Sequence, residues 1–257
     1  MAATADPVVV GPHRVRLALL AFAGGAILWD IAARVLDFPF VPSVGAIAGA
    51  TWRLLISGEV GRGLAASGGT LTMSYGSAVV VGVPAGLLLG RHRVLASVFS
   101  PYLDALLALP SLLLVPVFFG LFGLGLATQF AVVFCYSFAV IVEVTRSGLS
   151  TLDAGYVEMA RSFGASERQI YTRVLLRGAL PAVMTALRLG LARAIRALIN
   201  TEMLVGSAGL GALLRQYGTR LDAASTYGIL AVLIVLALAG HQAMHVADRR
   251  WNRWAAD

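Results

Sequence analysis

Residues 146–180, RSGLSTLDAGYVEMARSFGASERQIYTRVLLRGAL, form a polar segment of 35 residues between two long apolar runs. A turn between two packed helices needs only a few residues, so a segment of this length must have structure of its own. Its pattern predicts two short helices. Gly164 is expected to end the first in the left-handed conformation that glycine favours, and Ser166 to cap the second, with Glu167 in its first turn. The proline at position 181 is expected to stand in the first turn of the next long helix.

The apolar runs on both sides identify the chain as a membrane protein. Of 257 residues, 58% are hydrophobic and only 13% are charged, about half the charged share of a soluble domain. This composition excludes a disordered, nucleic-acid-binding or ordinary cytosolic protein. A spanning helix needs about 20 apolar residues. The sequence predicts an all-α membrane protein with six spans, at 17–36, 70–90, 98–119, 127–145, 181–205 and 227–246.

The arginines predict the orientation of these spans. All 20 basic residues are arginine. If both termini are cytoplasmic, thirteen arginines fall on the inner side and five on the outer side, and the remaining two, Arg193 and Arg196, lie within the fifth span. This asymmetry agrees with the enrichment of basic residues in cytoplasmic loops. The first 16 residues and residues 247–257 are then cytosolic tails. Residues 42–67 are expected to form an outer amphipathic segment, so that 17–62 holds the first span and most of that segment.

Two kinds of chemistry are excluded or disfavoured. Because the chain has no lysine, it cannot contain the phosphate-binding pattern G-x-x-x-x-G-K-[S/T], so any nucleotide chemistry must belong to another subunit. The single cysteine, Cys135, can form neither an intramolecular disulfide nor a cysteine metal cluster. His241 and His245 have the spacing of a helical metal pair but lack the intervening glutamate of H-E-x-x-H. We therefore expect no metal site.

Polar residues within the fifth predicted span are candidates for a solute path, because such groups are costly in lipid and mark function. Arg193, Arg196 and Asn200 are spaced by three and four residues and are expected to share a helix face. They line a translocation path, or Arg196 pairs with a polar neighbour and only fixes packing; the sequence leaves both open. Glu202, at the outer end of the span, is a candidate gate or structural residue of the same path.

The 146–180 segment resembles the EAA loop of the permease subunits of ABC importers. The resemblance rests on Glu158-Met159-Ala160, on Gly164 after three intervening residues, and on Val174-x-Leu176 after a further nine intervening residues. Met159 replaces the usual middle alanine, and Arg177 stands where a proline is usual. Residues 146–180 are called the EAA segment below.

Two further stretches are similar to the nitrate, sulfonate and taurine permease family. They are Leu109-Pro110 through Pro116 to Phe122-Gly123-x-Gly125, and Thr201-Glu202-Met203-Leu204 followed by Gly209-Leu210-Gly211. The resemblance runs from about residue 60 to 246. It implies a type I ABC importer permease fold over residues 63–246.

The resemblance also implies partners and a site. A cytosolic ATPase dimer would hold ATP and Mg, so this chain itself needs no cofactor and is not an enzyme. A periplasmic or lipid-anchored binding protein would deliver a small anion, such as a sulfonate, taurine, nitrate or aromatic acid, and a second permease chain would form a homodimer in the bacterial inner membrane. The residues implied to couple to the ATPase are Glu158, Ala160, Gly164, Ala165, Arg168, Gln169, Ile170 and Tyr171, with Ile170 and Tyr171 as apolar anchors in the partner's groove.

The alternative is a secondary transporter or channel that works without ATP. It would favour paired acidic residues within the membrane and an inverted repeat between the two halves. Neither is evident in the sequence, and the long EAA segment would then have no role. An intramembrane enzyme would need a nucleophile with its base, or metal ligands, at membrane depth.

Overall fold

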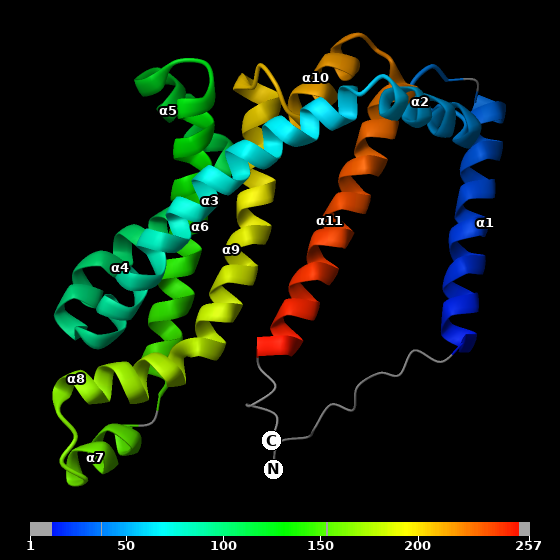
Figure 1. Ribbon diagram of the computed structural model, residues 1–257. Coiled ribbons are helices and arrows are strands. Elements are labelled where there is room, and N and C mark those ends of the chain that lie inside the picture. Colours follow the sequence, from blue (N-terminus) through cyan, green and yellow to red (C-terminus); the bar gives the residue numbers. More distant parts are fainter. Residues whose placement is uncertain (1–11, 37, 153, 252–257) are drawn as a thin grey trace.

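The computed structural model describes residues 12–36, 38–152 and 154–251, and every regular element within these ranges is a helix (Figure 1). In chain order these are α1 (Pro12–Leu36), α2 (Val44–Ile56), α3 (Glu59–Arg91), α4 (Arg93–Ala108), α5 (Ser111–Phe122), α6 (Leu126–Ser150), α7 (Ala154–Ser162), α8 (Glu167–Gln169), the π-helix η1 (Ile170–Leu175), α9 (Leu176–Val205), α10 (Leu210–Thr219) and α11 (Ala223–Trp251).

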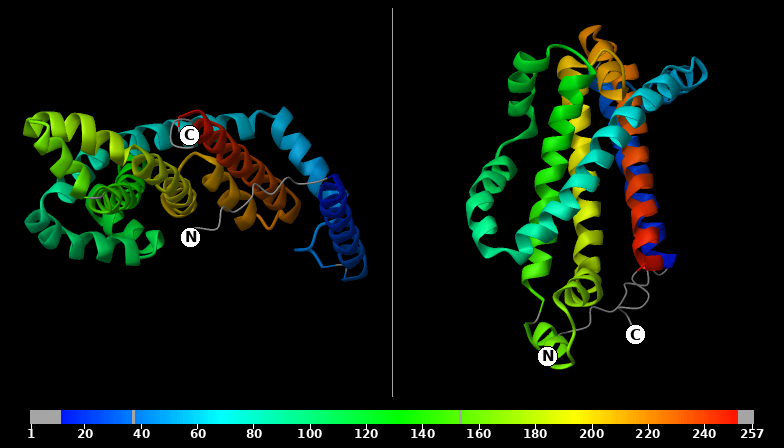
Figure 2. Two further views of the ribbon diagram at one scale, coloured as in Figure 1. Left: turned by 90° about the horizontal axis from the view of Figure 1, so that it is seen from below. Right: turned by 60° about the vertical axis from the view of Figure 1, so that its left-hand side comes forward.

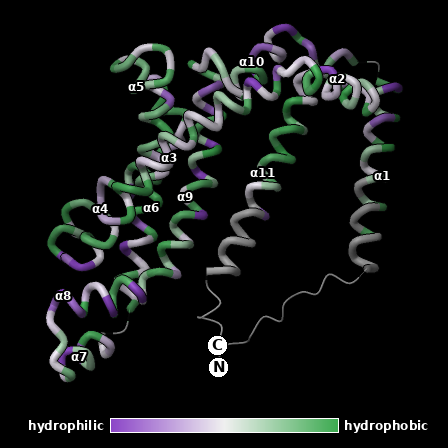
Figure 3. The backbone as a smooth tube through the Cα atoms, viewed as in Figure 1, coloured by the Kyte–Doolittle hydropathy of each residue, from purple (hydrophilic) through white to green (hydrophobic). Residues whose placement is uncertain are grey.

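The long helices are apolar enough to cross a membrane. In the described residues, four helical runs meet this criterion: Glu59–Arg91, Leu126–Ser150, Glu167–Val205 and Ala223–Gly240. The pair α4 and α5 makes a fifth if it is one broken span. Hydrophobic residues run along α6 and the upper half of α11 (Figure 3). The predicted first span coincides with α1, a helix of 25 residues, but several of its side chains lie outside the described residues.

The third predicted span, 98–119, contains Pro110 and Pro116, which are expected to kink it, and the structure shows a break at the first of them. The chain breaks at Leu109 and Pro110, and α4 and α5 are bent by 104° relative to each other. Proline cannot donate a backbone hydrogen bond, and it restricts the residue before it to extended conformations. Leu109 and Pro110 both adopt extended ψ values, 134° and 136°. The break therefore follows from the proline at position 110.

The outer amphipathic segment predicted over 42–67 is also wrong as one unit. Helix α2 ends at Ile56, and Gly58, with a φ of +74°, separates it from the next helix. The next residues already belong to α3, which begins at Glu59 and continues through the predicted second span to Arg91. The break at a glycine with positive φ is a local backbone effect that hydrophobic periodicity does not reveal.

Three glycines spaced by four residues allow α3 to pack tightly on α6. A Cβ added at Gly82 would lie 3.0 Å from Ile141, one at Gly86 would lie 2.7 Å from Thr145, and one at Gly90 would lie 2.9 Å from Leu149. Small residues at this spacing let helix backbones approach closely within a membrane. Helix α9 packs on α6 in the same way, since a Cβ on Gly190 would lie 2.7 Å from Ile141.

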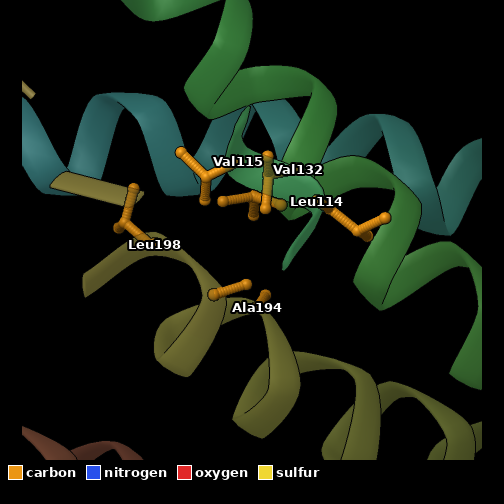
Figure 4. Close-up of a cluster of buried hydrophobic side chains, with 7 residues drawn as sticks. Leu114, Val115, Val132, Ala194 and Leu198 are labelled. Carbon is orange, nitrogen blue, oxygen red and sulfur yellow. The ribbon is translucent and has the colours of Figure 1, made fainter. Parts of the chain in front are cut away.

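The main hydrophobic cluster lies where α5, α6 and α9 meet. It contains Leu114, Val115, Val132, Val133, Ala194, Ala197 and Leu198. Figure 4 shows α9 presenting Ala194 and Leu198 towards the valines and leucine of the other two helices. This cluster fixes the C-terminal half of α9, the helix that carries the predicted path residues.

Helix α1 stands apart from the bundle of α3, α6 and α9 (Figures 1 and 2). It is attached at its upper end, where the Trp29 indole donates a hydrogen bond of 3.0 Å to the carbonyl of Pro42 and meets the ring of Tyr227 edge-on at 5.6 Å. The start of α1 and the end of α11 lie at the same end of the molecule as α7 and α8 (Figure 1).

Candidate functional site

The first half of the EAA segment forms α7 and a tight glycine turn, as the sequence predicts. Gly164 has a φ of +76°. Its N–H donates to the carbonyl of Arg161 at 2.9 Å, and the next N–H, of Ala165, donates to the carbonyl of Ala160 at 3.0 Å. This pair of bonds is the Schellman arrangement that ends helices at a left-handed residue. Ala160, Gly164 and Ala165 thus form one rigid turn.

The second half begins with the cap that the sequence predicts. The Ser166 side chain accepts a hydrogen bond from the backbone N–H of Gln169, and the Gln169 side chain accepts one from the backbone N–H of Ser166 at 2.8 Å. This reciprocal capping box satisfies two donors at the helix start. Gln169 therefore has a structural partner within the chain, while Arg168 is exposed.

The predicted boundary between this helix and the next span is wrong. The chain stays helical from Glu167 to Val205, and Pro181 lies inside α9 rather than at its start. A proline within a helix leaves a carbonyl of the preceding turn without its donor, and the wide π-helical turn of η1 lies just before it. Figure 1 shows α8 and η1 lying across the lower end of the bundle before the chain turns upward as α9. The part of the EAA segment from Glu167 onward and the span therefore form one continuous helical run.

A set of charged contacts joins this element to α3. Glu167 pairs with Arg161 at 2.9 Å and with Arg91, the last residue of α3, at 3.0 Å. The Arg91 guanidinium also lies over the ring of Tyr171, 5.7 Å from its centre. Exposed ion pairs contribute little stability individually, but here they connect three elements at one point. Sequence reasoning did not find Arg91, because it lies 76 residues from Glu167.

The structure gives the apolar residues of the EAA segment different exposures from those expected. Ile170 is only 1% exposed, so its side chain packs within this chain, and Tyr171 is half-buried. The most exposed large side chains are instead on or beside α7: Tyr156, Met159 and Phe163, the last 85% exposed. Their spacing of three and four residues places them on one face. Glu158 is also exposed, and its carboxylate pairs with no cation among the described residues.

The predicted path residues of α9 do not all point the same way. The Arg193 guanidinium lies 5.5 Å from the centre of the Tyr136 ring on α6, and the Asn200 amide donates to the Ser111 hydroxyl on α5 at 3.1 Å. Arg196 instead lines a cavity between α9 and α11, together with Arg188. Sequence reasoning missed Arg188 for the path. At 3.6 residues per turn, its spacing of eight residues places it about 80° around the helix from Arg196, no closer than Arg193, so periodicity alone does not single it out.

Glu202 is 1% exposed and faces the chain itself rather than a cavity. One carboxylate oxygen accepts a hydrogen bond from the Ser67 hydroxyl at 2.7 Å, and the other accepts one from the N–H of Gly211 at 2.8 Å. The Ser67 oxygen in turn accepts from the N–H of Leu210 at 2.9 Å. Glu202 therefore joins α9, α3 and the start of α10. Its buried polar atoms are satisfied, as a stable interior requires.

No metal centre is evident where side chains are described: there, no group of three or more His, Cys, Asp or Glu could hold an ion. His241 and His245 lie outside the side chains that the structure describes.

Residues 79–253 match the family model of the binding-protein-dependent transport system inner membrane component. The chain belongs to this family. It is a multi-pass membrane permease of the ABC importer type, and thus a transport component rather than an enzyme. The family's description places such permeases beside a solute-binding protein, and ABC transport systems contain an ATPase as the energy source.

This permease is similar to proteins of several transport systems. It is 26% identical over 191 residues to the taurine transport system permease of Escherichia coli, covering 74% of this chain and 70% of that one. It is 26% identical over 229 residues to the formylaminopyrimidine transport permease of Halalkalibacterium halodurans, covering 89% and 91%. Its fold is similar to a chain of the inward-facing MetNI methionine ABC transporter, with a TM-score of 0.65, 23% identity and coverage of 77% and 96%.

Proposed function

We propose that this permease imports a small anion across the bacterial inner membrane, driven by a separate ATPase dimer that docks on the EAA segment. The exposed apolar face of α7 carries the proposal. A phenylalanine that is 85% exposed, beside two other large exposed side chains, indicates a surface that a partner covers. The exposed carboxylate of Glu158 and the guanidinium of Arg168 add polar contacts at its edge.

The geometry suggests how movement of the ATPase reaches the membrane. The glycine turn and the capping box hold α7 and α8 rigidly together, and α8 continues without interruption into α9. Displacement of the docked face therefore moves α9 directly. The contacts of Arg91 with Glu167 and Tyr171 pass the same displacement to α3. ATP and Mg belong to the partner, since a chain without lysine cannot form its own phosphate-binding loop.

The proposed topology has six spans with both termini in the cytoplasm. The start of α1 and the end of α11 lie at the end of the molecule that carries the EAA segment (Figure 1), as an even number of crossings requires. The arginine asymmetry of the sequence supports the same orientation. A second copy of this chain completes the pathway, because closed two-fold dimers are the commonest symmetric assembly.

An anion is the proposed solute because the exposed guanidinium of Arg196 lies within a membrane span and forms no ion pair among the described residues. Such a charge is costly in hydrocarbon and marks a functional path. The taurine system of a relative handles a sulfonate, while other relatives and neighbours are named for formylaminopyrimidine and methionine. The argument for an anionic solute therefore depends on Arg196.

The test is purification of the full chain from its native membrane in mild detergent, with mass spectrometry of the proteins that accompany it. We expect a stoichiometric ATPase that contains a phosphate-binding loop. Phe163→Ala should lower the recovery of this ATPase by at least about tenfold while the chain still inserts, since fully burying a large apolar side chain is worth about 1.5–3 kcal/mol. Gly164→Ile should lower it as well, because isoleucine is strained at the φ of +76° that the turn requires. Tyr102→Ala is the matched control, because Tyr102 is a similarly exposed aromatic residue on α4.

Two results would contradict the proposal. One is a chain that purifies alone and moves solute into liposomes without ATP, which would identify a secondary carrier. The other is equal recovery of the ATPase with Phe163→Ala, Gly164→Ile and the unchanged chain.

A further inference from the structure

A cavity of about 340 Å³ lies between α9 and α11. Its lining includes two arginines and otherwise apolar groups: Arg188, Arg196, Leu191, Ile195, Ala237 and Gly240. No acidic side chain is among the described residues that line it. A volume of this size suits a small molecule. The walls of the cavity are therefore mainly apolar and carry positive charge.

Both arginines of the cavity lining come from α9. They are eight residues apart, which corresponds to slightly more than two helical turns and about 12 Å along the axis. Arg196 lies nine residues before the end of α9, or about 14 Å from its outer end, and so near the middle of a membrane. Arg188 lies nearer the end that carries the EAA segment.

A third arginine on the same helix provides an internal comparison. Arg193 is directed to the other side, where its guanidinium lies over the Tyr136 ring, and it does not line the cavity. Arg196 is exposed and has no acidic partner in the described part of the chain. The cavity therefore presents a guanidinium of α9 that is available to an incoming anion.

We propose that this cavity binds an organic anion that has an apolar body. A guanidinium recognises a carboxylate, sulfonate or phosphate through paired charge-assisted hydrogen bonds. Arg196 contacts the anionic group, and Ile195 and Ala237 contact the body. The inference rests on the proposed import function and adds its intramembrane site. The same chemistry is present in a small transported anion and in an anionic lipid.

The experiment measures binding of 4-fluorobenzenesulfonate by fluorine NMR to the full complex with its ATPase, in nanodiscs of phosphatidylcholine and without the binding protein. The neutral 4-fluorobenzenesulfonamide is the matched probe. We expect the sulfonate to bind at least about fivefold more tightly than the sulfonamide, because only the sulfonate forms charge-assisted bonds. Arg196→Gln should remove that preference, and Arg193→Gln, the matched variant, should keep it.

Further arms identify the source of the anion. If phosphatidylglycerol in the nanodisc displaces the sulfonate, the cavity takes a lipid headgroup; if binding is unchanged, it takes the small anion. Should Arg196→Gln fail to assemble, Ala237→Phe fills the cavity without removing a charge and should abolish binding. Equal binding of both probes, or equal effects of Arg196→Gln and Arg193→Gln, overturns the inference. Stimulation of the ATPase by the binding protein, measured in the same complex, tests the import function separately.

Discussion

At the residue scale, the packing around Glu202 explains why the chain has glycine at positions 206, 209 and 211. A Cβ on Gly206 would lie 2.6 Å from the Glu202 carbonyl oxygen, and one on Gly211 would lie 2.6 Å from the carbonyl oxygen of Ile199. A Cβ on Gly209 would overlap the Glu202 carboxylate itself. The chain can fold back over the carboxylate only because side chains are missing at these positions. The stretch from Thr201 to Gly211 therefore encodes one compact loop.

The residue-scale prediction concerns Gly209→Ala. This position combines a φ of +112° with contact to the carboxylate, so alanine should destabilise the chain by roughly 1–3 kcal/mol. Thermal unfolding of the purified complex in detergent measures the effect as a lower melting temperature. Gly68→Ala is the matched control, since Gly68 lies within α3 and an added Cβ meets nothing within 4 Å. Equal melting temperatures for both variants would contradict the account of the loop.

At the scale of elements, the glycines of α3 make a second prediction. Gly86→Leu should prevent α3 from packing on α6, because even a Cβ would lie 2.8 Å from the carbonyl oxygen of Val142, a backbone atom that cannot move aside. Overpacking typically costs about 1–3 kcal/mol, and we expect the upper end. The measurement is the temperature at which half of the protein is lost from the monodisperse peak in size-exclusion chromatography. Gly76→Leu, at an open site on the same helix, should behave like the unchanged chain; a loss as large as that of Gly86→Leu would refute the packing argument.

The start of α11 supplies a prediction about pH. Both Asp222 carboxylate oxygens accept hydrogen bonds from Ser225, at 2.7 Å from its hydroxyl and 3.0 Å from its N–H, and these bonds hold the pKa of Asp222 below its usual 3.8. A carboxylate with a lowered pKa contributes its full stability above the usual value and loses it as the pH falls through the lowered one. Asp222→Ala should therefore cost about 1 kcal/mol equally at pH 7 and pH 5.

Melting temperatures of the two proteins at both pH values test this, and Asp222→Asn, which keeps an acceptor, serves as the control. If Asp222→Ala has a lower melting temperature than the unchanged chain at pH 7 but the same one at pH 5, Asp222 does not act as an ionised cap over this range.

The sequence predicts elements where the determining interactions are local. The turn at Gly164 and the cap at Ser166 depend on residues within five positions of each other, and both are confirmed. Other features depend on how α3, α6 and α11 pack around α9. These are the contact of Arg91 with Glu167 and the different directions of Arg193 and Arg196. The periodicity of a single helix carries no information about such packing. The bend between α4 and α5 is predictable only in part. The sequence shows through Pro110 where the bend lies, but not that its angle is 104°.

At the scale of the whole molecule, the two ends of the bundle have different roles. The lower end in Figure 1 carries α7, α8 and the exposed face of Tyr156, Met159 and Phe163. The upper end carries α10 and the loop that folds over Glu202. Helix α9 connects the two ends, with Arg188 and Arg196 between them. Import driven by a cytosolic ATPase requires the lower end to be cytoplasmic.

This requirement gives the last prediction. In a Cys135→Ser background, single cysteines are introduced by Ser162→Cys in α7 and by Ser207→Cys in the loop before α10, both exposed positions. A membrane-impermeant maleimide should label Ser207→Cys in intact spheroplasts, and should label Ser162→Cys only after the membrane is permeabilised, because charged reagents do not cross the hydrocarbon core. The permeabilised samples control for reactivity at each site. Labelling of Ser162→Cys in intact spheroplasts would place the EAA segment outside the cell, where no ATPase can reach it, and both the topology and the proposed coupling would have to be abandoned.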